Sequence, residues 1–160
     1  MGITIGPVDW WLASPQGYSG LIAGCPVGTS LPDGSKIICK AGGTAWIVAP
    51  SCTQVSQTWN NTTTTQVGDK CCVCDWPTLC TRMISCGFNP GDWFVPSLSQ
   101  LQNPGYTCRT QWDTYDATCY WASTESSATN AHSICFVSTN NQFKNKAATY
   151  CVRAFRCVTY

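Results

Sequence analysis

The stretches that decide the fold lie in the last third of the chain: YWASTE at residues 120–125, ICFV at residues 134–137 and YCVRAFRCV at residues 150–158. They are short and rich in aromatic and β-branched residues, which is typical of strands. Side chains alternate between the two faces of a strand, and neither face of 150–158 is purely polar. We therefore predict an antiparallel sheet with strands near 120–123, 131–137 and 150–158, the last of them an interior strand.

A hairpin is predicted upstream of these strands. Two short apolar runs, residues 35–39 and 44–49, flank a turn that contains two glycines, and this arrangement is a hairpin signal. Residues 16–35 are interrupted repeatedly by Gly and Pro, which predicts a loop. Residues 51–66 are rich in Thr and Asn around a single Trp59, and we interpret them as a surface excursion.

The strongest helix signal covers residues 76–86. Asp75 can cap the N-terminus of this helix, and Pro77 lies near the first turn, where its missing N–H costs little. Gly87 follows the last turn and suits a left-handed stop.

A second, shorter helix and a long aromatic loop are predicted next. The helix begins at Ser97, whose hydroxyl can form a capping box with Gln100, and ends near residues 103–105. The aromatic rings of the loop at 104–118 can stack on a sugar or a protein surface, with charged side chains adding polar contacts. The candidate binding residues are Tyr106, Arg109, Trp112, Asp113 and Tyr115. In the alternative interpretation, these rings fill the core beneath the loop.

The composition indicates one domain and excludes two classes of partner. A chain of 160 residues is long enough for a single buried core. Charged residues make up only 11% of the chain, the net charge is +1, and the Lys and Arg residues are scattered, so we expect no nucleic-acid partner. No apolar run reaches membrane-spanning length, so we expect no membrane span.

The first residues are predicted to form an N-terminal arm, residues 1–15, ahead of a domain that covers residues 16–160. The arm carries apolar side chains with little polar cover, so it is expected to pack against something. Its candidate assembly contacts are Ile5, Trp10 and Trp11. The alternative is that both Trp residues cap the core of their own domain.

Thirteen cysteines predict a disulfide scaffold, and their odd number leaves at least one without a partner in the same chain. The disulfide candidates are Cys25, Cys39, Cys71, Cys72, Cys74, Cys80, Cys86, Cys135 and Cys151. The pairs Cys25–Cys39 and Cys135–Cys151 are two possibilities, and the sequence leaves the connectivity open. The N-terminus shows no basic export region. A disulfide scaffold without an export region is expected of a protein that is assembled into a particle in a bacterial cytoplasm and released by lysis, because its thiols can oxidise after assembly.

Metal binding is the competing interpretation of these cysteines. Cys72, Cys74, Cys80 and Cys86 differ in spacing from the paired knuckles of zinc sites, so disulfides are favoured and we expect no metal or other cofactor. The single histidine, His132, is interpreted as an exposed strand residue, because a catalytic base needs a nucleophile and an orienting partner within reach. We therefore predict no catalytic residue.

Several short motifs together resemble a known family. They are WAST at 121–124, Phe136, Lys144 or Lys146, YCVRAFR at 150–156, DWFVPSL at 92–98 and GGTAWIVAP at 42–50. The pattern resembles small C-type-lectin-like domains of the bacterial and phage kind, which are allied in fold to the formylglycine-generating enzymes. The resemblance implies an α+β fold with small antiparallel sheets, two short helices and long loops. No residue-by-residue match exists to the active-site motif of those enzymes, and the tripeptides with which many animal lectins bind calcium are absent.

The resemblance implies a non-enzymatic virion surface protein that decorates a capsid or belongs to a tail, because phage virions use domains of this kind. Its expected location is the virion surface, outside the cell after release. The expected partners are other virion proteins or copies of itself, and a host-surface glycan or protein. Two alternatives stay open: a cysteine- or metal-dependent enzyme related to the formylglycine-generating enzymes, and a cysteine-rich secreted adhesin.

Overall fold

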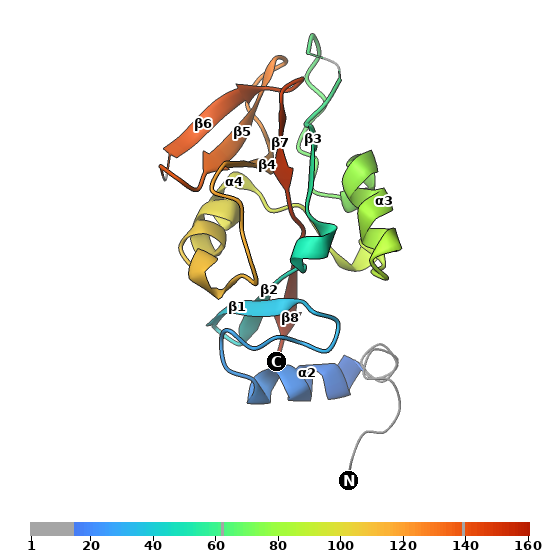
Figure 1. The fold of residues 1–160 in the computed structure, drawn as a ribbon, viewed down its shortest axis with the longest axis vertical. Helices are drawn as coiled ribbons and strands as arrows, with labels where there is room; N and C mark the ends of the chain where they lie inside the picture. The colour runs from blue at the N-terminus through green and yellow to red at the C-terminus, as the bar shows by residue number, and fades with distance from the viewer. Residues whose placement is uncertain (1–14, 62, 139) are drawn as a thin grey trace.

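The computed structural model describes residues 15–61, 63–138 and 140–160 and shows an α+β fold with two sheets and several short helices (Figure 1). The predicted fold class, a small α+β protein with disulfides, is confirmed. The predicted N-terminal arm lies outside the described residues, apart from Pro15. Within the described part of the chain, every helix is too short or too polar to cross a bilayer.

The smaller sheet contains the predicted hairpin and the end of the chain. Its strand order is β1 (Lys36–Ala41), β2 (Thr44–Val48) and β8 (Phe155–Thr159), and neighbouring strands are antiparallel. Gly42 and Gly43 have φ angles of 57° and 76° at the hairpin turn, a region that L side chains rarely adopt. The hairpin prediction is confirmed.

Helix α2 (Pro15–Gly24) packs against β8 and lies at the lower end of the molecule in Figure 1. The prediction of a loop over residues 16–35 is therefore wrong for its first part. Ile22 is fully buried in the core, and this packing outweighs the low helix propensity of the glycines in the segment.

The larger sheet has the strand order β3-β7-β4-β5-β6. All of its pairs are antiparallel except β4 and β7, which run parallel. The strands are β3 (Val55–Thr58), β4 (Cys119–Glu125), β5 (Asn130–Cys135), β6 (Asn140–Asn145) and β7 (Thr149–Val152). The predicted strands near 120–123 and 131–137 correspond to β4 and β5.

The predicted single strand over residues 150–158 is in fact two strands in two sheets. β7 ends at Val152, β8 begins at Phe155, and Figure 1 shows the chain passing from the larger to the smaller sheet between them. Only β7 is interior, since β8 lies at an edge of its sheet. Arg153 explains the break, because its guanidinium is buried and bonded to groups outside both ladders.

Helix α3 (Pro77–Ser85) confirms the predicted helix to within one residue at each end. Gly87 has a φ angle of 90° after the last turn, as predicted. The predicted Asp75 cap is wrong: Trp76 occupies the N-cap position, and its side chain makes no capping hydrogen bond. Trp76 is instead fully buried, so core packing determines where this helix begins.

Helix α4 (Leu98–Gln100) begins with the predicted capping box. The Gln100 backbone N–H donates to Ser97 Oγ at 3.3 Å, and the Ser97 N–H donates to Gln100 Oε1 at 2.9 Å. Irregular helical turns continue over η4 (Leu101–Tyr106), with an extended backbone at Asn103 before Pro104, so the helix ends close to the predicted place. Short 3-10 turns are η1 (Ser51–Thr53), η2 (Val73–Asp75), η3 (Pro90–Asp92) and η5 (Arg109–Gln111).

The prediction of a surface excursion over residues 51–66 is wrong at its centre. β3 pairs with β7 at one edge of the larger sheet, and Trp59 directly after β3 is fully buried. The Trp59 indole N–H donates to the Ala122 carbonyl at 2.9 Å, and its ring meets the Trp76 ring edge-on at 6.1 Å. A polar strand at a sheet edge has the composition of a loop, and for this reason the composition of residues 51–66 predicted a surface excursion instead of a strand.

Candidate functional site

A polar hollow of about 530 Å³ lies beside the edge strand β3 and the start of α3. A smaller hollow of about 230 Å³ shares Asn60, Lys70 and Asp75 with it, so the two form one recess, which we call the β3 recess. Hydroxyl and amide side chains make up most of its lining: Ser56, Gln57, Thr58, Asn60, Asn61, Thr78 and Thr149. Such a lining offers many neutral donors and acceptors of hydrogen bonds.

The end of β3 positions the amide side chains of the recess. Thr58 pairs with Thr149 of β7, and the backbone N–H groups of Trp59 and Asn60 both donate to the Lys146 carbonyl, at 2.9 and 3.1 Å. The buried Trp59 ring anchors the chain at this point. Asn60 is therefore held at the rim by a fixed backbone.

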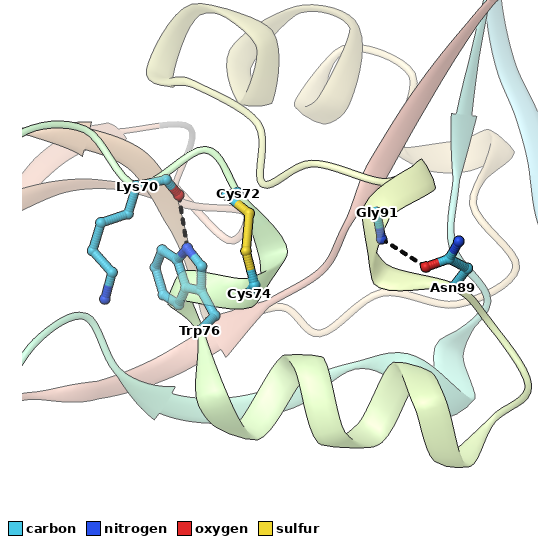
Figure 2. The surroundings of a disulfide bond; sticks show 6 residues. All are labelled: Lys70, Cys72, Cys74, Trp76, Asn89 and Gly91. Carbon is cyan, nitrogen blue, oxygen red and sulfur yellow. Dashed lines mark hydrogen bonds between the residues drawn. A yellow bond between two sulfur atoms is a disulfide. The ribbon is translucent and has the colours of Figure 1, made fainter.

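Lys70 is the cationic group of the recess, and its side chain is half-buried. Its ammonium donates to the Trp59 carbonyl and lies over the rings of Trp59 and Trp76, 4.9 and 4.7 Å from their centroids. The Trp76 indole N–H donates to the Lys70 carbonyl at 2.7 Å, as Figure 2 shows. Burial lowers the pKa of Lys70 and the charge of Lys146 lowers it further, while Asp75 opposes both.

A buried ion pair, Lys146–Glu125, is hydrogen-bonded to segments that line the β3 recess. Lys146 Nζ lies 2.6 Å from Glu125 Oε2, and their side chains are 0% and 8% exposed. Glu125 also accepts hydrogen bonds from the N–H groups of Val67 and Gly68, at 2.8 and 3.0 Å. Burial alone would raise the pKa of Glu125, but the hydrogen bonds from Lys146, Val67 and Gly68 bring it below its ordinary value.

Two disulfides are present in the described part of the chain. Cys72–Cys74 closes a short ring that begins two residues after Lys70 and lies next to Trp76 in Figure 2. The same figure shows the Asn89 side chain accepting a hydrogen bond from the Gly91 N–H. Cys119–Cys135 joins the paired strands β4 and β5. Cys135 therefore bonds to Cys119 and not to Cys151, which the sequence interpretation had offered as its partner.

The other cysteines are thiols: Cys25, Cys39, Cys52, Cys71, Cys80, Cys86, Cys108, Cys151 and Cys157. The possible pair Cys25–Cys39 is therefore open in this structure. Within residues 15–61, 63–138 and 140–160, no three His, Cys, Asp or Glu side chains are grouped so as to hold a metal ion.

One ring of the predicted aromatic binding loop, that of Trp112, is part of the core. Trp112 is only 4% exposed, and its ring meets those of Tyr120, Phe136 and Phe155 edge-on at 5.3 to 5.6 Å. Tyr115 is the one large aromatic side chain of this loop that is exposed, at 40%. Trp112 thus fills the core, as the alternative interpretation proposed.

The charged residues of the same loop have internal partners. The guanidinium of Arg109 stacks on the Tyr106 ring at 4.0 Å. Asp113 Oδ1 accepts from Arg153 Nη1 at 2.8 Å, and Asp113 Oδ2 accepts from the Ser51 N–H at 2.7 Å. These contacts hold the loop against the sheets and leave fewer polar groups for a ligand.

His132 lies on a strand, β5, as predicted, but it is half-buried and not exposed. Its Nδ1 is 3.3 Å from Asn141 Oδ1, and its ring meets the Phe143 ring edge-on at 4.8 Å. Among the described residues, these contacts provide neither the nucleophile nor the carboxylate with which a catalytic histidine works.

The β3 recess was missed in the sequence because its residues are spread over four separate segments. The available signal was Trp59: a lone Trp in a polar stretch is a candidate anchor, since Trp is highly buried on average. Comparison with known proteins gave no match, either to a protein-family model or to a curated protein.

Proposed function

We propose that the chain is a non-enzymatic recognition protein of a virion surface, with a C-type-lectin-like fold. Two small sheets, short helices and long loops agree with the arrangement that the resemblance implies. The residues of the resemblance also occupy structural positions: Trp121 and Phe136 are buried in the core, and Arg153 joins the two sheets. The virion location rests on the resemblance.

The observation that carries the recognition role is the lining of the β3 recess. Neutral hydroxyl and amide groups surround the half-buried Lys70, with Asp75 nearby. A glycan presents many hydroxyl groups, and a recess of convergent donors and acceptors can pair with them. We assign a host-surface glycan to this recess and propose the β3 recess, and not the aromatic loop, as its binding site.

Site-directed variants and a glycan array test this assignment. Asn60→Ala and Lys70→Met remove one neutral and one charged group from the recess, and each is expected to weaken glycan binding about tenfold, the effect of losing one hydrogen bond to a charged or well-placed group. Arg109→Ala on the aromatic loop is the matched control and should bind as the wild type does. Loss of binding in Arg109→Ala, with Asn60→Ala unaffected, would assign the ligand to the loop instead.

A further inference from the structure

Two thiols that are distant in sequence meet where η1 packs against the end of α3. Cys52 lies in η1, and Cys86 is the residue that caps α3. The Cys86 thiol donates to the Cys52 carbonyl at 3.2 Å, and Arg82 of the same helix reaches this carbonyl at 3.5 Å. The sulfur of Cys86 is therefore held against the backbone of Cys52.

The two thiols also act on one another electrostatically. Partial burial and the neighbouring Cys86 thiol raise the pKa of Cys52 to about 11, and Asp113 adds to the effect. A thiol perturbs another in this way only at short range.

A second pair of thiols, Cys39 and Cys108, comes together where β1 packs against η5. Cys39 lies on β1, Cys108 immediately precedes η5, and β1 packs against η5. Both side chains pack against the same hydrophobic cluster, which includes Leu101 and Phe155. Partial burial and the Cys108 thiol raise the pKa of Cys39.

We propose that Cys52 with Cys86, and Cys39 with Cys108, are two further disulfide sites that close when the folded chain meets a low-molecular-weight disulfide such as oxidised glutathione. In each closure, one protein thiolate attacks the external disulfide and releases one glutathione thiol. The second protein thiol then displaces the other glutathione, so one protein S–S bond forms while one external S–S bond is reduced to two thiols.

The two bridges have defined structural consequences. Cys52–Cys86 ties the turn before β3 to the end of α3, and Cys39–Cys108 ties the small sheet to the aromatic loop. Both link segments far apart in sequence, whereas the two existing bridges are local, with separations of 2 and 16 residues. The inference needs only oxidising surroundings and is independent of glycan binding.

Mass mapping of the whole protein tests the pairing. The folded protein, with its two existing disulfides intact, is incubated in a glutathione redox buffer, its remaining thiols are alkylated, and it is digested with trypsin without reduction. Peptide 83–109 holds both Cys86 and Cys108, and we expect it to be linked to peptide 37–40 through Cys39 and to peptide 41–70 through Cys52. The number of alkylated cysteines should fall from nine to five.

A second cut before Asp92 separates Cys86 from Cys108 and identifies each partner. Cys52→Ser should leave Cys86 alkylated and the Cys39–Cys108 bridge intact, and Cys157→Ser, the control, should leave both bridges unchanged. Exchanged partners, bridges to Cys25 or Cys71, or alkylation of all four cysteines after oxidation would overturn the proposal.

Discussion

Tyr120 shows at the scale of one residue how a buried polar group holds two segments together. Its hydroxyl donates to Gln54 Oε1 at 2.6 Å and accepts from the Asp116 N–H at 2.7 Å, while the side chain is 1% exposed. Burial, as the largest cause, raises its pKa to about 12 from an ordinary 10.0. The fold therefore favours the protonated phenol.

Tyr120→Phe is expected to lower the free energy of unfolding by about 1 kcal/mol at neutral pH, because the Asp116 N–H loses its acceptor and Gln54 Oε1 loses one of its donors. The raised pKa makes the contribution of Tyr120 complete below pH 10 and causes its loss as pH rises to about 12. Urea denaturation at several pH values checks both effects: the alkaline loss of stability should be smaller in the variant. Equal alkaline losses in variant and wild type would show that another group causes them.

The Lys146–Glu125 pair makes a second prediction at this scale. Glu125→Gln leaves the fully buried ammonium of Lys146 without its charge partner, so it should lower the free energy of unfolding by about 3 to 5 kcal/mol. The double variant Glu125→Gln/Lys146→Met removes both charges and should recover much of that loss. Chemical denaturation measures all three proteins, and a double variant less stable than Glu125→Gln would contradict this account of the pair.

At the scale of elements, most local signals predict the structure correctly, although the Asp75 cap and the loop at the start of residues 16–35 were wrong, and the long-range contacts were not predicted. The hairpin, α3 and the capping box at Ser97 depend on neighbours within a few residues, and the sequence shows those neighbours directly. Trp59 and the cysteine pairing depend on contacts between distant segments, which alternation and spacing do not encode. The β3 recess was missed for the same reason.

The junction between β7 and β8 carries the clearest element-scale prediction. Arg153 donates to Gln54 Oε1 at 2.9 Å, to the Thr114 carbonyl at 2.7 Å and to Asp113 at 2.8 Å, so it joins η1, the aromatic loop and both sheets. Arg153→Met should lower the free energy of unfolding by about 1 to 3 kcal/mol, because Asp113 loses its charge partner and Gln54 Oε1 and the Thr114 carbonyl each lose a donor. Arg156→Met, three residues later on β8, is the control, with a smaller expected loss. A larger loss in Arg156→Met, measured by urea denaturation, would contradict the assigned role.

At the scale of the whole molecule, we predict that the N-terminal arm makes the assembly contact. Trp10→Ala or Trp11→Ala should weaken incorporation into the particle or oligomer by about 2 kcal/mol, the effect of removing one Trp from the centre of an interface. Sedimentation of the variants measures assembly, and near-ultraviolet circular dichroism checks that the domain stays folded. Unchanged assembly and stability after deletion of residues 1–13 would exclude this role. Loss of folding would show that both Trp residues belong to the core.

The proposed location of the protein at a virion surface can be tested by immunogold electron microscopy of intact particles released from the source cells. Antibodies against the folded chain are applied before and after the particles are opened. If the protein lies on the virion surface, gold should label the outside of intact particles, with little further labelling after opening. Labelling confined to the cells, or seen only in opened particles, would contradict the proposed location.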